Sequence, residues 1–157
     1  MIPNRLVLDT NVLLDLFVFH DPRWACLLLA LQQGKAEAVT RADCRDEWHH
    51  VLRYPHLPLS EATRPAAQAQ FDALIALVTP PAGGAPLPTC SDRDDQKFLE
   101  LARDAQASML VTKDKALLKL ARRTARAGMF RILTPEAWVR EHEAAQEAAK
   151  PAAVPLE

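Results

Sequence analysis

The sequence predicts a three-layer α/β/α domain built on a central parallel sheet of about five short strands. Two observations predict this class. Apolar runs too short to be helices alternate along the chain with longer stretches of helical periodicity. Glycines, prolines and polar residues separate these segments. Strands that alternate with helices at this spacing pair in parallel, and their helices cover both faces of the sheet.

Four of the strands can be placed by their apolar runs. These runs lie at residues 5–8, 37–40, 109–112 and 130–133. The first run ends at Asp9, and Thr10 and Asn11 after it can cap a helix rich in Leu and Phe. The chain is therefore expected to open as strand, turn and helix.

Helical periodicity fills the intervals between the strands. It predicts helices at residues 21–33, 41–53, 60–77, 91–106 and 115–127, and a last helix that begins at Pro135. Gly34 ends the first of these. Pro55 and Pro58 interrupt the chain after the second, because proline removes a donor and pushes its predecessor into an extended conformation. Residues 79–88 hold four prolines and two glycines, so they are expected to form a loop.

Length and composition predict a single domain over residues 1–143. A chain of 157 residues can bury one sizeable core, and its 49% hydrophobic and 25% charged residues are close to globular averages. The remaining tail, residues 144–157, is rich in Ala, Pro and Glu and is expected to be frayed or disordered. The net charge of -1 gives no global sign of nucleic-acid binding, so any such function must depend on local patches.

The cysteines and the N-terminus predict a cytoplasmic location. Cys26, Cys44 and Cys90 are widely spaced and form no CxxC pair, which argues against a disulfide framework and against a thiolate zinc site. The first residues show no charged and then apolar leader, and no apolar run is long enough to span a membrane. Neither export nor membrane insertion is expected.

Several carboxylates follow predicted strands, at the edge where open parallel sheets bind ligands. Asp9 comes directly after the first strand, and Asp114 follows the strand at 109–112 by two residues. Asp92 and Asp95 open the helix after the proline-rich loop. Aspartate is also a favoured helix N-cap, so capping is the alternative explanation for each of them.

Helical geometry separates these acids further. At about 100° per residue, Asp95 falls in the middle of the apolar stripe around Leu99, and Asp92 lies near its edge. In the helix at 41–53, Glu47 adjoins the buried stripe beside Val51. A carboxylate directed toward the protein needs a compensating cation or hydrogen-bond donors. For Glu47, an arginine partner is the alternative explanation.

A divalent cation would explain the convergence of these acids. Carboxylates gathered at one end of a sheet repel one another and raise one another's pKa unless a cation lies among them. Hard oxygen ligands without a cysteine pair favour Mg²⁺ or Mn²⁺ over zinc. Such ions activate water and stabilise the leaving oxygen in phosphodiester cleavage. The pattern thus indicates a metal-dependent hydrolase.

Four motifs in a fixed order carry a family resemblance. They are Asp9-Thr10-Asn11-Val12-Leu13, the helical Glu47, Asp92-Arg93-Asp94-Asp95 ahead of Phe98-Leu99, and Leu110-Val111-Thr112-Lys113-Asp114. Together they resemble the PIN-domain family over roughly residues 5–135, most closely the branch described as toxin components of toxin-antitoxin systems. The sequence has Lys113 where a glycine is common in the family, and Ser108 where an aspartate often precedes the strand.

The resemblance implies a site and an activity. The implied metal ligands and catalytic residues are Asp9, Glu47, Asp95 and Asp114. The implied supporting residues are Thr10, Asn11, Asp92 and Thr112. The implied reaction is cleavage of single-stranded RNA by metal-activated water, which leaves a 5′-phosphate and a 3′-hydroxyl. The implied partners are single-stranded RNA, an antitoxin protein and a second copy of the chain in a homodimer.

Basic residues after Asp114 suggest a path for the RNA backbone. They recur at spacings of four, three and four, at Lys115, Lys119, Arg122 and Arg126. On one continuous helix they would share a face about 60° wide, with Leu117, Ala121 and Ala125 turned away. Together with Lys113, this face could bind phosphates. A solvated helix face is the alternative explanation.

Other functions are weighed against the nuclease. A phosphatase of the haloacid dehalogenase type usually needs a second aspartate two residues after Asp9, where this chain has Asn11. A response-regulator receiver expects paired acids at the first strand and a phosphorylatable aspartate after a middle strand, and neither is evident. The main alternative is a non-catalytic module that binds RNA or a protein partner and whose acids cap helices.

Overall fold

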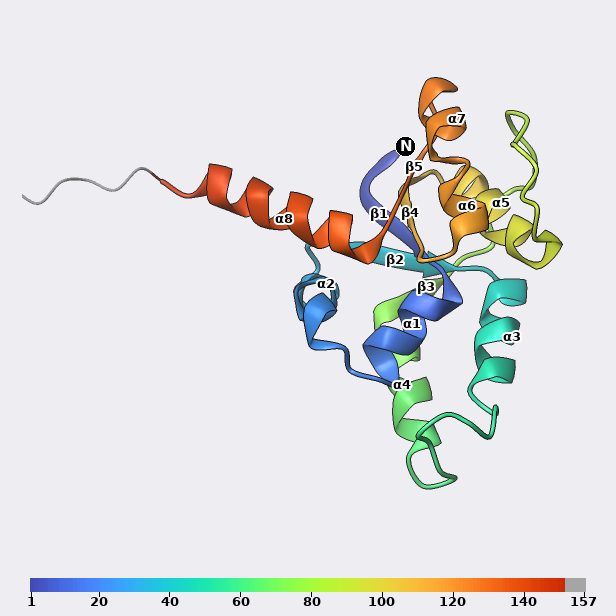
Figure 1. Ribbon diagram of the computed structural model, residues 1–157, viewed down its shortest axis with the longest axis vertical. Coiled ribbons are helices and arrows are strands. Elements are labelled where there is room, and N and C mark those ends of the chain that lie inside the picture. Colours follow the sequence, from blue (N-terminus) through green and yellow to red (C-terminus); the bar gives the residue numbers. More distant parts are fainter. Residues whose placement is uncertain (152–157) are drawn as a thin grey trace, which may run out of the picture.

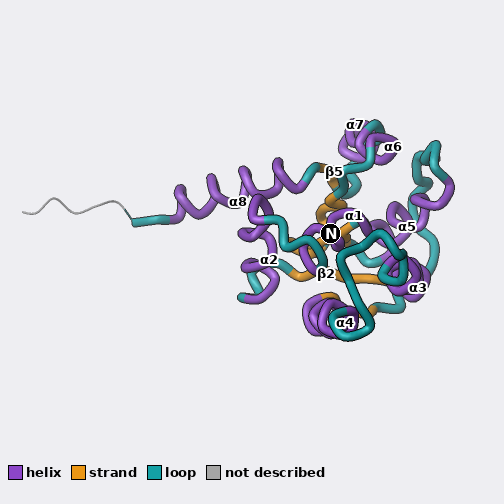
Figure 2. Tube along the Cα trace, turned by 60° about the horizontal axis from the view of Figure 1, so that its bottom comes forward, coloured by secondary structure: helices purple, strands orange, loops and turns teal. Residues whose placement is uncertain are grey.

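A five-stranded sheet, parallel at every pairing, forms the centre of the computed structural model, which describes residues 1–151 (Figure 1). The strand order is β3-β2-β1-β4-β5. The strands are β1 (Ile2–Leu8), β2 (Glu37–Thr40), β3 (Ile75–Leu77), β4 (Ala107–Val111) and β5 (Arg131–Leu133). Helices lie on both sides of the strands (Figure 2), which confirms the predicted three-layer α/β/α class.

The strand order places β1 at the centre of the sheet, and the chain adds strands first on one side of β1 and then on the other. From β1 the chain builds outward through β2 and β3, and it then crosses back to pair β4 with the other edge of β1. Leu6 of β1 is thereby in register with Ala38 on one side and with Met109 on the other. In open α/β sheets, ligands bind outside the carboxyl ends of the strands at such a switch point.

Two buried clusters of side chains lie between the sheet and its helices, one on each face of the sheet. Both faces contribute because successive strand residues point to opposite sides. Leu6 and Leu8 enter the first cluster and Val7 enters the second. The helices that supply the first cluster are α1 (Thr10–Phe17), α2 (Ala25–Gln32), α4 (Arg64–Leu74) and α8 (Pro135–Ala149), together with Trp48 of the helix between α2 and α4. The helices α5 (Gln96–Asp104) and α6 (Lys115–Leu118) supply the second cluster. The next helix, α7 (Ala121–Arg126), packs against this cluster through its first residue, Ala121.

An aromatic group fixes α3 (Ala42–Val51) against its neighbours. Trp48 of α3 stacks on Phe71 of α4, with ring centroids 5.0 Å apart. Phe17 of α1 meets both rings edge-on, at 6.0 and 6.2 Å. All three side chains are at most 1% exposed. This packing positions the helix that carries Glu47 beside the helix that begins after Asp9.

The structure corrects the predicted helix at residues 60–77. The helix begins at Arg64 and ends at Leu74, and the next three residues form β3. Ile75 is in register with Ala38 of β2, so β3 satisfies the edge of that strand. Pairing with a neighbouring strand outweighs the local helical preference of these residues. The sequence pattern of the segment gives no sign of this pairing.

The predicted helix at residues 115–127 is also wrong as one continuous helix. A turn at Lys119 and Leu120 separates α6 from α7. The Leu120 amide donates to the carbonyl of Leu117, three residues back, at 3.0 Å. This tighter turn accompanies the burial of both leucines in the second cluster.

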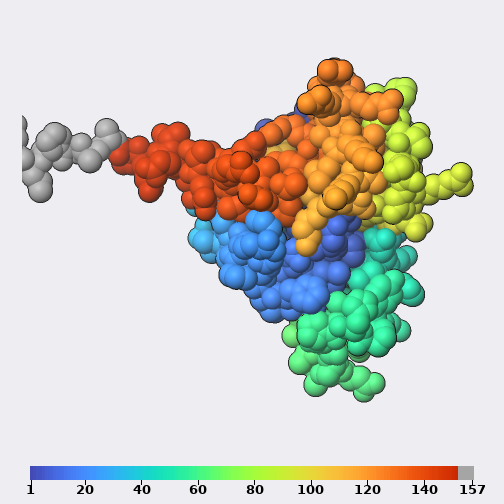
Figure 3. Space-filling view, viewed as in Figure 1, coloured from blue at the N-terminus to red at the C-terminus, as the bar shows by residue number. Residues whose placement is uncertain are grey.

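Two other predicted helices begin with short 3₁₀ turns. The turn η1 (Pro22–Trp24) precedes α2, and η2 (Arg93–Asp95) precedes α5. At the other end of the chain, α8 continues to Ala149, past the predicted boundary at residue 144. It projects away from the rest of the domain (Figure 3). Residues 152–157 of the predicted tail lie outside the described residues. Within the described part, no helix is long and apolar enough to cross a membrane.

Candidate metal centre

Asp9 lies at the junction of the two central strands. Its backbone amide donates to the Val111 carbonyl at 3.0 Å, which continues the β1–β4 pairing. One carboxylate oxygen caps α1 by accepting from the Thr10 amide at 2.6 Å. The other accepts from the Thr112 hydroxyl at 2.7 Å. Asp9 is 4% exposed, so its carboxylate is both buried and fixed in orientation.

Thr112 connects Asp9 to Asp114. While its hydroxyl donates to Asp9, the same oxygen accepts from the Asp114 amide at 2.9 Å. Asp114 then caps α6, with one carboxylate oxygen 2.7 Å from the Ala116 amide. The threonine is fully buried. One hydroxyl therefore sets the relative positions of two acids from different strands.

Asp92 and Asp95 approach Asp114 from the start of α5. Carboxylate oxygens of these three residues all lie within 4.8 Å of one another. Asp92 is exposed and caps η2, accepting from the Asp94 amide at 3.0 Å. Asp95 is 9% exposed and its side chain caps no helix. Both acids join the cluster, whereas Asp94 does not.

Glu47 lies at the margin of this group. One of its carboxylate oxygens accepts from the Thr10 hydroxyl, and the other is 3.1 Å from the ammonium of Lys97 on α5. The glutamate side chain is 26% exposed. A cation does pair with Glu47, as the alternative explanation required, but it is a lysine and not an arginine.

Burial and mutual repulsion raise the pKa values of the most enclosed acids. Burial raises the pKa of Asp9 to about 6, and the charges of Glu47 and Asp114 add to it. Burial also raises the pKa of Asp95, followed by its hydrogen bond with Asp114 and the charges of Asp9, Asp114 and Asp92. That same hydrogen bond lowers the pKa of Asp114. The hydrogen bond between the two carboxyl groups thus moves their pKa values in opposite directions.

Helix capping explains part of this arrangement. It accounts for one oxygen each of Asp9, Asp92 and Asp114. It does not account for Asp95 or for the convergence of three acids. Among the ion pairs of residues 1–151, none involves these four aspartates. An all-oxygen, anionic and uncompensated donor set fits a hard divalent cation such as Mg²⁺ or Mn²⁺.

The predicted supporting residues divide into two groups. Thr10 and Thr112 both donate hydroxyl hydrogen bonds to acids of the site. Asn11 makes no such contact, because its side-chain oxygen is buried and has no hydrogen-bond partner in the described part of the chain.

The predicted basic stripe does not lie on one continuous helix. Its members are all exposed but are divided between α6, the following turn and α7, at Lys115, Lys119, Arg122 and Arg126. Ala125, predicted to turn inward, is exposed, and Thr124 is the buried residue of α7. A single helical phase therefore does not hold across the turn at Leu120, and RNA binding by these residues stays a prediction.

Lys113 has an acidic partner that the sequence reasoning missed. Its ammonium is 2.6 Å from a carboxylate oxygen of Asp15 on α1, and the same oxygen accepts from the indole of Trp24 at 3.1 Å. A signal was present, since Asp15 is the charged residue in an otherwise uncharged helix. The pairing of Glu47 with Lys97 was missed too, because a contact between residues 50 positions apart leaves no local pattern.

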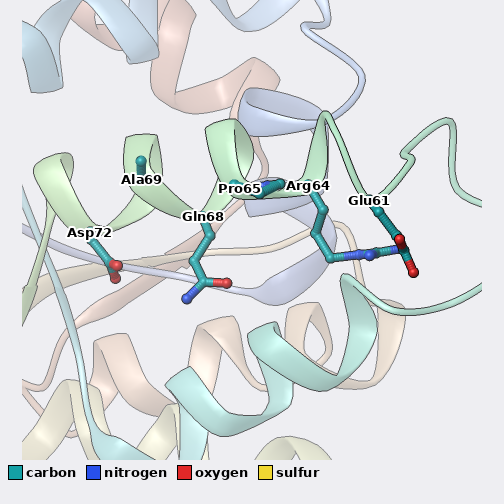
Figure 4. A pocket seen from close by; sticks show the side chains of 6 residues that line it. All are labelled: Glu61, Arg64, Pro65, Gln68, Ala69 and Asp72. Carbon is teal, nitrogen blue, oxygen red and sulfur yellow. The ribbon is translucent and has the colours of Figure 1, made fainter.

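A hollow along α4 is separate from these acids. It has a volume of about 350 Å³ and is lined by Glu61, Arg64, Pro65, Gln68, Ala69 and Asp72 (Figure 4). Two of its charged groups already bridge to α3: Arg64 donates to the Leu52 carbonyl at 3.0 Å, and Asp72 lies 3.2 Å from Arg45. None of the predicted site residues lines it.

A family model described as PIN domain matches residues 5–116, which is more than half of the chain. The chain belongs to the PIN-domain family. PIN domains are generally metal-dependent nucleases and typically use a divalent metal. The match includes all five acids described above and ends two residues after Asp114. Among curated proteins, no match to this chain is found.

Proposed function

We propose that this PIN domain is an endoribonuclease that uses Mg²⁺ or Mn²⁺ and metal-activated water to cleave single-stranded RNA. The observation that carries the proposal is Asp95. This carboxylate is 9% exposed, caps no helix and lies beside other acids without a cationic partner among the described residues. Such a group is costly unless a cation joins it.

In the proposed site, four acids hold the metal and Asp92 assists them. The four are Asp9, Glu47, Asp95 and Asp114. Thr112 and Thr10 orient the acids through their hydroxyl groups. When bound, the divalent metal supplies water activation and stabilises the leaving oxygen. Asp9 already has a fixed orientation in the metal-free protein, so little ordering of this side chain accompanies binding.

The substrate and the biological role extend this proposal. The exposed basic residues that follow Asp114 support an anionic strand passing the site. Attack by metal-activated water is proposed to leave a 5′-phosphate and a 3′-hydroxyl. We further propose that the protein is the cytoplasmic toxin of a type II toxin-antitoxin pair. In this role it forms a homodimer, and an antitoxin protein inhibits it.

The second candidate is a non-catalytic module that binds RNA or a protein partner. The observation that favours it is the set of capping hydrogen bonds made by Asp9, Asp92 and Asp114. Under this alternative the acids stabilise helix ends, and the protein binds RNA or a partner without cleaving it.

Cleavage of an end-labelled single-stranded RNA distinguishes the two candidates. The wild-type protein is expected to cut in Mg²⁺ or Mn²⁺ and to stop in EDTA. Asp95→Asn and Asp114→Asn are each expected to lose at least about 10- to 100-fold, the loss typical of residues that merely orient a ligand. Asp94→Asn is the matched control, because Asp94 is an exposed neighbour outside the cluster.

Two outcomes would contradict the proposal. Undiminished cleavage by Asp95→Asn and Asp114→Asn would refute the site assignment. RNA binding without cleavage in any divalent metal would favour the binding module.

A further inference from the structure

Lys97 places a positive charge at the edge of the acidic group. It lies in the first turn of α5, two residues after Asp95. Its ammonium is 3.1 Å from one carboxylate oxygen of Glu47, and it also donates to the Asp94 carbonyl. The lysine side chain is 19% exposed, so the ammonium has lost much of its contact with water. Among residues 1–151, it is the cation that pairs with a predicted metal ligand.

Both oxygens of Glu47 are engaged in this arrangement. The Thr10 hydroxyl donates to one and Lys97 binds the other. Glu47, like Asp9, is absent from the group of three acids whose oxygens lie within 4.8 Å of one another. The Lys97 ammonium and a divalent cation at this site are both attracted to the same carboxylate and repel each other, so the charge of Lys97 opposes binding of the cation at Glu47.

We propose that Lys97 is an internal counter-ion that holds Glu47 in the metal-free protein and competes with the divalent cation for it. This inference rests on the proposed metal-dependent function. It assigns Lys97 a positioning role that lowers the affinity of the site for metal. The exchange is feasible because an ion pair with 19% and 26% exposed partners is only partly desolvated, and a doubly charged cation attracts the carboxylate more strongly.

The fold makes this exchange local. Glu47 and Lys97 lie on α3 and α5, which are neighbours in the structure (Figure 1). Trp48, next to Glu47, is fully buried in one core cluster, and Phe98, next to Lys97, is 1% exposed in the other. Because both backbones are held by buried neighbours, the side chains can separate while the helices stay in place.

Calorimetric titration with MnCl₂ alone tests the inference. Lys97→Met is expected to bind Mn²⁺ about 5- to 20-fold more tightly than wild type, the range expected for coupling between groups in contact. Lys115→Met is the matched control. It removes the same charge from an exposed lysine one residue after Asp114, where no ion pair is present in the described structure. The control is expected to change the affinity by no more than about twofold, since exposed charges are screened.

A double-mutant cycle tests whether the effect passes through Glu47. In a Glu47→Gln background, Lys97→Met is expected to change Mn²⁺ affinity by less than about twofold. An equal effect with and without Glu47, or an equal effect of Lys115→Met, overturns the inference, because it shows general electrostatics. Weaker or unchanged binding by Lys97→Met overturns it as well. If that variant does not fold, Lys97→Gln takes its place with the same expected result.

The titration also distinguishes failure of this inference from failure of the proposed function. If wild type binds Mn²⁺ and Asp95→Asn weakens the binding while Lys97→Met does not change it, the counter-ion role alone is wrong. If neither wild type nor Lys97→Met binds Mn²⁺ at millimolar concentration, both the metal-dependent function and the counter-ion role are wrong.

Discussion

At the scale of single residues, the Thr112 hydroxyl hydrogen-bonds to two acids of the site. Thr112 donates to Asp9 and accepts from the backbone of Asp114, and its side chain is fully buried. Two acids that are 105 positions apart in the sequence are therefore oriented by the same atom. A valine at this position would keep the shape of the side chain and remove both hydrogen bonds.

Thr112→Val is expected to lower the free energy of unfolding by about 1–3 kcal/mol, because it leaves buried polar groups unpaired. It is also expected to weaken Mn²⁺ binding by about 10- to 100-fold. Chemical denaturation and metal titration measure the two effects. Thr124→Val is the control, since Thr124 is equally buried but hydrogen-bonds to the Ala121 carbonyl, within its own helix. Equal loss of metal affinity in both variants would contradict the role of Thr112.

The raised pKa of Asp9 predicts how stability depends on pH. Its folded value is about 6, against 3.8 as the ordinary value, so between these pH values the folded protein retains a proton that the unfolded chain releases. The contribution of Asp9 to the stability of the metal-free protein is therefore expected to fall as pH rises through this window and to level off above it. The loss from this residue is at most about 3 kcal/mol.

Denaturation in EDTA between pH 4 and 7 measures this dependence. Asp9→Asn removes the titrating group, so the difference in stability between the two proteins is expected to change across the window and to flatten above about pH 7. Metal binding requires the ionised carboxylate, and the affinity of wild type for Mn²⁺ is expected to rise over the same window. A difference that does not vary with pH would contradict the raised pKa.

At the scale of elements, the parts of the fold that the sequence predicts are those governed by local pattern. The runs at residues 5–8 and 37–40 form strands because their apolar residues pack on helices at both faces, and Asp9 follows its strand as predicted. Helical phase correctly directed Asp95 toward the protein. The phase argument failed at residues 115–127, where a tight turn at Leu120 resets the helical direction.

Contacts between distant segments account for what could not be predicted. The strand β3 forms because its backbone pairs with the edge of β2. The sequence of residues 75–77 alone does not reveal this pairing. The pairs formed by Glu47 with Lys97 and by Asp15 with Lys113 depend on how helices are packed across the sheet. Such contacts follow from tertiary structure, whereas the positions of Asp9 and Asp114 follow from the strands that precede them.

The pair formed by Lys113 and Asp15 ties the loop before Asp114 to α1. Lys113→Met would leave the Asp15 carboxylate, whose side chain is 10% exposed, without its cation. The expected loss of stability is about 1–3 kcal/mol, below the value for a fully buried pair because Lys113 is 38% exposed. Urea denaturation measures it. Lys119→Met, at an exposed lysine of the α6–α7 turn, is expected to stay within about 0.5 kcal/mol. Unchanged stability with weaker RNA binding would instead place Lys113 at the substrate.

At the scale of the whole molecule, charge is distributed unevenly. The net charge is only -1, yet the acids gather at the carboxyl ends of the central strands and exposed arginines and lysines follow them on α6 and α7. The helix α8 projects away from the rest of the domain (Figure 3). An RNA strand that reaches the acids is expected to use the first of these surfaces.

Salt dependence of RNA binding tests this expectation. In an Asp95→Asn background, which prevents cleavage, Arg122→Ala together with Arg126→Ala is expected to weaken binding. The slope of log affinity against log salt is expected to fall by about 0.7 for each phosphate that the variant no longer neutralises. Fluorescence anisotropy with a labelled single-stranded RNA measures both. Arg140→Ala, on α8, is the control and is expected to leave the slope unchanged. Equal effects of the two sets would rule out a specific path along α7.

The position of β1 in the sheet determines when the site can first exist. During synthesis β1 emerges before its neighbours, whereas β4 ends at Val111 and Asp114 comes later still. One edge of β1 must wait until β4 is made, with its backbone groups unpaired, and closing so long a loop makes this pairing slow. A chain interrupted just before Asp114 contains Asp9, Glu47, Asp92 and Asp95 but lacks the last acid of the group. Under the proposed ribonuclease function, such an incomplete chain is expected to be unable to cleave RNA.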